Sequence, residues 1–138
     1  LYADNVIEHI PLDGTRALLA EAYRCMQPGG VIRLLTPDIR THVELYLAGD
    51  VDGEVAARYR RIGLVVEHPV DLVRVPIASF GHHLGYVYDF DSLDAELKRA
   101  GFHSTRRCEM NDSDIPEFVG LKTKAEGGMA QLVVEATR

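Results

Sequence analysis

The spacing of apolar residues changes several times along the chain, and each change predicts a new element. Apolar residues dominate positions 1–6 and Pro11 follows them, which predicts a short strand that ends in a loop. Between residues 14 and 27 the apolar residues recur every three or four positions, so we expect an amphipathic helix with Asp13 as its N-cap. The Pro-Gly-Gly sequence at residues 28–30 ends this helix.

A second strand and a second helix follow in the same manner. Residues 31–35 form a short apolar run that predicts a buried strand, in which Arg33 is expected to be a paired or edge charge. The Thr-Pro-Asp sequence at residues 36–38 is typical of a helix start, with Asp38 favourable to the helix dipole. The predicted helix ends near Gly49. Four of its side chains are expected to face the core: Ile39, Val43, Tyr46 and Leu47.

The following part of the chain is less regular. Residues 51–80 begin with helical spacing and then lose it, so we expect a helix followed by an irregular excursion. Asp91 is predicted to cap a further helix, and Gly101 ends it. Two more strands are predicted, over residues 102–108 and 129–136.

The order of these elements favours the α/β class, because strands and helices alternate along the chain. The last two predicted strands are connected by a polar loop over residues 111–128 without a helix, which implies that one strand of the sheet is antiparallel. A chain of 138 residues fits one domain with one core.

Composition narrows the class of function. The formal net charge is −6 and the basic residues form no concentrated patch, which argues against a nucleic-acid partner. Cys25 and Cys108 lie far apart in the sequence and are expected to be free, buried thiols. Neither a bilayer-spanning apolar stretch nor a signal peptide is visible, so we expect a cytoplasmic protein without a membrane partner.

Three segments in the first part of the chain carry a resemblance to a known family: residues 3–10 (ADNVIEHI), 19–30 (LAEAYRCMQPGG) and 31–38 (VIRLLTPD). They resemble the fourth strand, fourth helix and fifth strand of class I S-adenosylmethionine-dependent methyltransferases, and the resemblance covers most of the chain. The resemblance continues further along the chain. A predicted, methyltransferase type 11-like subgroup of this family is resembled by residues 88–93 (YDFDSL), 100–102 (AGF) and 112–117 (DSDIPE). The resemblance implies a Rossmann-like sheet of which the chain supplies strands four to seven, with one antiparallel strand and flanking helices.

The family's glycine-rich loop and its ribose-binding acidic residue have no counterpart in this sequence. The resemblance therefore implies that residues 1–138 are a single, partial domain, the carboxyl-terminal half, and that the cofactor-binding amino-terminal half would precede Leu1. The first strand would then expose an apolar edge, which upstream residues, a second copy or a strand-exchanged partner would cover.

The first group of candidate site residues follows the first strand, where ligands of open α/β sheets bind. The resemblance implies that the backbone of Ala3, Asp4 and Asn5 lines the methionine portion of S-adenosylmethionine. It also implies that Glu8 and His9 face the methyl acceptor. His9 is the candidate catalytic base, because imidazole titrates near pH ~6.5. The structural alternative is that Glu8 and His9 satisfy helix-start amides or each other.

The second group of candidates comprises His82, His83, Tyr86 and Tyr88, in a segment where the family often has a flap over the acceptor pocket. These side chains are expected to bind the acceptor, with a solvated or packed loop as the structural alternative. Adjacent histidines point in different directions, so we expect no metal site.

The resulting hypothesis is methyl transfer from S-adenosylmethionine to a small-molecule or saccharide-like acceptor. The alternative is a non-catalytic, methyltransferase-like domain that binds a protein through the edge strand. A metal-dependent hydrolase using His9, His82 and His83 ranks last, because the sequence has no spaced ligand motif.

Overall fold

The computed structural model describes residues 1–121 and 130–138, which form strands, α-helices and short 3-10 helices. In chain order the elements are β1 (Tyr2–Asp4), η1 (Ile7–His9), α1 (Leu12–Cys25), β2 (Val31–Pro37), α2 (Ile39–Ala48), α3 (Glu54–Arg61), α4 (Asp71–Ala78), η2 (His82–Leu84), α5 (Phe90–Ala100), β3 (His103–Arg107), η3 (Pro116–Phe118) and β4 (Gln131–Thr137). Within this part of the chain no helix is long and apolar enough to cross a membrane.

The described strands form one mixed sheet in the order β1-β2-β4-β3. β1 runs parallel to β2, whereas β4 runs antiparallel to both β2 and β3. The predicted α/β class and the single antiparallel strand are therefore confirmed. β4 can lie between β2 and β3 because the connection from β3 to β4 needs no crossover helix.

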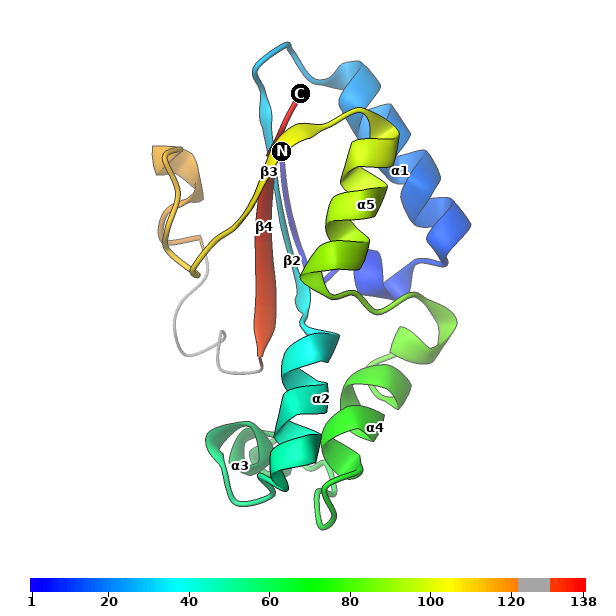
Figure 1. The fold of residues 1–138 in the computed structure, drawn as a ribbon, viewed down its shortest axis with the longest axis vertical. Coiled ribbons are helices and arrows are strands. Elements are labelled where there is room, and N and C mark those ends of the chain that lie inside the picture. The colour runs from blue at the N-terminus through cyan, green and yellow to red at the C-terminus, as the bar shows by residue number, and fades with distance from the viewer. Residues whose placement is uncertain (122–129) are drawn as a thin grey trace.

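One face of the sheet packs against α1 and α5 (Figure 1). Alternate residues of the two central strands point to this side, as strand geometry requires. The buried members of this main core are Ile7, Leu19, Ala22, Ile32, Leu34, Tyr88, Leu93, Leu97, Phe102, Leu132, Val134 and Ala136. Each large apolar side chain buried here contributes about 1.5–3 kcal/mol to folding.

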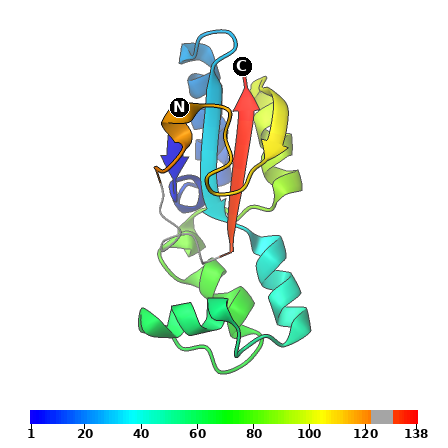
Figure 2. The same cartoon turned by 90° about the vertical axis from the view of Figure 1, so that its left-hand side faces the viewer.

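The opposite face of the sheet lies against the segment that follows β3 and contains η3 (Figure 2). The ring centroids of Tyr2 and Phe118 are 6.2 Å apart across this contact. Arg33 points to the same side and pairs with Glu135 at 2.5 Å, so the expected paired charge is confirmed. This face is therefore held by polar contacts as well as apolar ones.

α2, α3 and α4 lie beyond the carboxyl end of β2 and form a smaller apolar cluster (Figures 1 and 2). Its buried members are Ala56, Tyr59, Val66, Leu72 and Val75. The sequence predicted α3 but not α4, because Pro76 reads as a helix breaker. Burial of Leu72 and Val75 on one side of a short helix outweighs that local penalty.

The predicted start of α2 at Thr36 is wrong. Thr36 and Pro37 continue β2 and pair with Leu132 and Gln131 of β4. The N-cap is Asp38, whose carboxylate accepts a hydrogen bond from the Arg40 amide at 3.2 Å. Pairing within the sheet therefore overrides the helix-start pattern. Proline is tolerated because the pairing with β1 stops at Leu35, so β2 has a free edge at Pro37.

The predicted inward face of α2 is also wrong for three of its four residues. Val43, Tyr46 and Leu47 are 39%, 42% and 75% exposed. His42 is buried instead, with its Nε2 atom 3.3 Å from the Tyr59 hydroxyl. A polar side chain thus takes the inward position because a buried partner satisfies it.

Two predicted N-caps each move two residues towards the N-terminus. α1 begins after Pro11, which places Asp13 in its first turn. α5 is capped by Asp89, whose carboxylate accepts from the Ser92 amide at 2.9 Å while the Ser92 hydroxyl accepts from the Asp89 amide at 3.0 Å. This reciprocal capping box replaces the predicted Asp91 cap.

The other boundaries lie close to their predictions. Gly49 and Gly101 end α2 and α5 with φ values of 69° and 106°, as expected. Residues 122–128 of the predicted polar loop lie outside the described residues, and so does Met129, the first residue of the predicted last strand. Cys108 is buried, whereas Cys25 is exposed on the last turn of α1, which corrects the expectation of two buried thiols.

Candidate functional site

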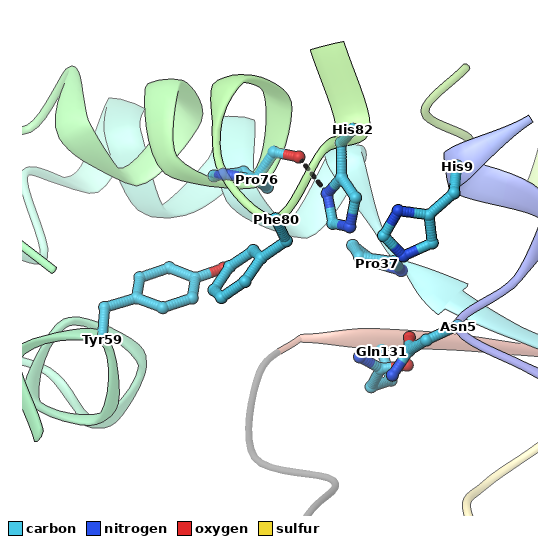
Figure 3. A pocket seen from close by; sticks show the side chains of 8 residues that line it. All are labelled: Asn5, His9, Pro37, Tyr59, Pro76, Phe80, His82 and Gln131. Carbon is cyan, nitrogen blue, oxygen red and sulfur yellow. Dashed lines mark hydrogen bonds between the residues drawn. The ribbon is translucent and has the colours of Figure 1, made fainter. Parts of the chain in front are cut away.

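A cavity of about 180 Å³ lies at the carboxyl ends of β1 and β2, where these strands meet η1, η2 and the cluster of α2–α4 (Figure 3). The residues that line it are Asn5, His9, Pro37, Tyr59, Pro76, Phe80, His82 and Gln131. The sheet and the small helical cluster therefore each supply part of its wall.

Asn5 turns the chain out of β1 at the edge of this cavity. Its φ is +51°, a left-handed conformation that asparagine tolerates better than most residues. Its backbone amide donates to the Leu35 carbonyl at 3.0 Å, so the end of β1 stays attached to β2. The side chain of Asn5 lines the cavity (Figure 3).

η1 places three successive side chains in three environments, because a 3-10 helix turns by a third of a circle at each residue. Ile7 enters the main core and anchors the turn. Glu8 is fully buried behind the cavity, whereas His9 is exposed and lines the cavity. Burial raises the pKa of Glu8, and the neighbouring His9 imidazole and Thr36 hydroxyl act in the opposite direction.

His82 approaches from η2, and its ring centroid lies 4.7 Å from that of His9 (Figure 3). Its Nδ1 atom is 2.7 Å from the Pro76 carbonyl oxygen. A carbonyl only accepts, so Nδ1 carries the proton and Nε2 is left as an acceptor or ligand atom. Burial lowers the pKa of His82, and the nearby His9 adds to this effect. His82 is therefore a neutral imidazole near neutral pH.

The helix that orients His82 is stabilised at its start by Asp71. The Asp71 carboxylate accepts from the amides of Glu67 and His68 at 2.9 and 3.0 Å. The His68 and Glu67 amides, together with the Arg74 side chain, lower the pKa of Asp71 to about 2. These contacts fix the start of α4, whose last turn presents the Pro76 carbonyl.

Glu8, His9 and His82 form a cluster of metal-ligand types. The ligand atoms of these three residues all lie within 4.8 Å of one another. Two imidazoles and one carboxylate are a donor set that transition metals accept. Among the residues that the structure describes, these three are the His, Cys, Asp or Glu side chains whose ligand atoms lie close enough together to hold one metal ion.

The rest of the cavity wall is mainly apolar and comes from Pro37, Tyr59, Pro76 and Phe80, with Gln131 as its polar member. The Phe80 ring lies 5.6 Å from the His82 ring, centroid to centroid. Phe80 has φ of +60°, a conformation that costs energy for a bulky residue and that often occurs at functional sites. The tight turn at residues 80–81 thus brings an aromatic ring next to the two histidines.

The sequence-predicted residues separate into two sets. Asn5, His9 and His82 line the cavity, and Glu8 lies directly behind them. Ala3 packs against the main core, and the Asp4 carboxylate lies 3.4 Å from the Tyr2 hydroxyl.

The remaining three predicted residues, like Ala3 and Asp4, are not part of the cavity lining. His83 is exposed beside His82. Tyr88 is fully buried in the main core, and Tyr86 packs on it with ring centroids 5.0 Å apart. Their predicted contact with an acceptor has no support in this arrangement of side chains.

Pro37 lines the cavity from the end of β2, and four further lining residues were not predicted from the sequence: Tyr59, Pro76, Phe80 and Gln131. They come from α3, α4, the link to η2 and β4. The helical spacing of Tyr59 indicated only that it is buried, and no local pattern relates these four positions to Asn5 or His9.

No protein-family model matches this chain, and a search of the curated proteins found no match either.

Proposed function

We propose that this chain forms part of an S-adenosylmethionine-dependent methyltransferase that acts on a hydroxyl or amine of a small-molecule or saccharide-like acceptor. The observation that carries the proposal is the cavity at the carboxyl ends of two parallel strands, with Asn5 on one side and the His9–His82 pair on the other. Ligands of open α/β sheets bind at this position. The mixed sheet with one antiparallel strand adds support.

The residues at the end of β1 fit one portion of the cofactor. Asn5 lines the cavity, and its side-chain amide oxygen is an acceptor suited to the ammonium group of a methionine moiety. A cavity of about 180 Å³ is smaller than the ~300–1,000 Å³ that encloses a whole ligand of that size. These residues therefore suit the methionine portion and not the complete molecule. When bound, S-adenosylmethionine would supply a methyl group already activated by the sulfonium.

The histidines suit the acceptor side of such a reaction. His9 is exposed to the cavity, so its imidazole can take the proton that an acceptor hydroxyl loses during transfer. The His82 ring packs edge to face against the His9 ring, so the two imidazoles lie side by side at the cavity. Tyr59 and Phe80 provide an apolar wall that excludes water and fits the flat face of a sugar or ring.

The first experiment measures S-adenosylmethionine binding by calorimetry and release of S-adenosylhomocysteine with a panel of small hydroxyl and amine acceptors. We expect His9→Ala to lower turnover by ~10²–10⁴-fold, because it removes the base, while the cofactor Kd stays unchanged. His103→Ala, at an exposed histidine on β3, is the control and should behave as wild type. A protein that binds no S-adenosylmethionine and releases no product would contradict the proposal and favour the non-catalytic alternative.

A further inference from the structure

We infer that Glu8, His9 and His82 bind a divalent transition-metal ion, with Zn²⁺ the ion that their donors suit best. Borderline-soft Zn²⁺ accepts imidazole nitrogen and carboxylate oxygen, and two histidines with one glutamate form one of its recurrent catalytic ligand sets. The sequence alone argued against a metal because His82 and His83 diverge. The structure pairs His82 with η1 instead of with its neighbour.

The three ligand atoms need only small adjustments to share one ion. They lie within 4.8 Å of one another, whereas ligands on a common Zn²⁺ with bonds of ~2.0–2.2 Å lie roughly 3.3 Å apart at the tetrahedral angle. Rotation of the exposed His9 side chain can supply most of this change. Gly81 lies next to His9, where a Cβ would make only an ordinary van der Waals contact with His9 Nδ1 at 3.7 Å, so the backbone of η2 does not crowd the His9 ring.

The hydrogen bond made by His82 is the outer-shell contact that metal-binding histidines usually make. Such a histidine donates from its second ring nitrogen to a carbonyl or carboxylate, which fixes the tautomer and the ring plane. Here Nδ1 donates to the Pro76 carbonyl at 2.7 Å. Pro76 lies in the last turn of α4, where carbonyls lack an intrahelical donor. Nε2 of His82 is thereby presented to Glu8 and His9.

A three-ligand set leaves at least one coordination position for a water or substrate oxygen. The same cavity that His9 and His82 line would hold that oxygen, with Tyr59 and Phe80 limiting access of bulk water. An ion at this point would polarise a coordinated hydroxyl and ease loss of its proton. His9 would then act as a ligand, and the free-base role proposed above would belong to the metal-free protein.

This inference goes beyond methyl transfer and does not depend on it. The experiment adds Zn²⁺ or Co²⁺ alone, without cofactor or acceptor, and measures the stoichiometry and Kd by calorimetry and the visible absorption of bound Co²⁺. We expect one equivalent of either ion. A protein that binds no metal can still bind S-adenosylmethionine, and a protein that binds no S-adenosylmethionine can still bind metal. The two experiments therefore test the two proposals separately.

Single substitutions test whether each of the three residues is a metal ligand, with a histidine elsewhere in the protein as the control. We expect His9→Ala, His82→Ala and Glu8→Gln each to weaken Zn²⁺ binding by about 100-fold or more, whereas His103→Ala binds as wild type. His9 is exposed, so His9→Ala keeps the fold even where a buried substitution does not, and circular dichroism checks each variant. Unchanged affinity in His9→Ala, or no stoichiometric Zn²⁺ in the wild type, would overturn the site. Stoichiometric Mn²⁺ without Zn²⁺ would overturn the choice of ion.

Discussion

Gly85 controls how closely the two histidine-bearing turns approach each other. A Cβ at this position would lie 2.0 Å from the Glu8 carbonyl oxygen and 2.8 Å from the His9 carbonyl carbon. Its φ is −107°, so contact with η1, and not a left-handed backbone, requires glycine here. The distance between His9 and His82 therefore depends on the absence of one methyl group.

We expect Gly85→Ala to lower the free energy of unfolding by about 2–3 kcal/mol, because two backbone segments must separate to admit the methyl group. Urea denaturation measures this loss, and metal or cofactor binding should weaken with it. The matched control is Gly63→Ala, where φ is +87° and a Cβ would meet nothing within 4 Å. That control tests backbone strain alone, at about 1–2 kcal/mol. Equal losses in the two variants would contradict a steric role for Gly85.

The sequence predicted the polar half of the site better than the apolar half. Asn5 and His9 follow a strand directly, so the position of a strand end was enough to place them. Tyr59 and Phe80 reach the cavity only because α3 and the turn after α4 fold back over the sheet. Such placement depends on packing between distant segments, which no local spacing encodes.

At the scale of elements, periodicity predicted that helices exist but not always which side they bury. In α5 the apolar residues Leu93 and Leu97, which are four positions apart, are both fully buried, as helical periodicity predicts. In α2 the predicted Leu47 is mostly exposed, because the buried contact between His42 and Tyr59 sets the rotation of the helix. One satisfied polar pair can therefore outweigh an apolar stripe on a short helix.

This difference gives a direct test with two leucines in helices of similar length. We expect Leu97→Ala to lower the free energy of unfolding by about 2–5 kcal/mol, since it leaves a cavity in the main core. Leu47→Ala should change it by less than ~0.5 kcal/mol, since that side chain is 75% exposed. Chemical denaturation monitored by circular dichroism compares them. A large loss from Leu47→Ala would mean that another surface covers this face of α2.

At the scale of the whole molecule, one buried ion pair connects the sheet to the segment after β3. Arg33 donates to Glu135 and to the carbonyls of Glu109, Met110 and Asp112 at 2.7–3.0 Å. Both charged side chains are almost completely buried. Burial opposes the charge on Glu135, but the Ser113 hydroxyl, Arg33 and Arg106 outweigh it and hold the pKa of Glu135 below its ordinary value.

We expect Glu135→Gln to destabilise the fold by about 3 kcal/mol at neutral pH, because Arg33 loses its buried counter-charge. A carboxyl whose pKa is lowered in the folded state contributes stability above the unfolded pKa of ~4.3 and loses it as the pH falls further. Wild type should therefore lose stability below about pH 4, and Glu135→Gln should show a flatter acid profile.

The control for this pair is Glu109→Gln, which removes the same charge from an exposed side chain nearby. Its backbone carbonyl still accepts from Arg33, so its acid profile should match the wild type. Equal acid profiles for all three proteins would show that the Arg33–Glu135 pair does not carry the pH dependence.

The main core and the smaller apolar cluster of α2–α4 meet along a boundary, here called the seam, and the cavity lies at this boundary. Asn5, His9 and Gln131 belong to the sheet side, while Tyr59, Pro76 and Phe80 belong to the α2–α4 side. Any molecule or ion that bridges the seam binds only while both sides are folded and in contact, so its binding free energy adds to the cohesion between them. A ligand in this small space would therefore stabilise the contact between two parts of the protein that are packed around separate apolar clusters.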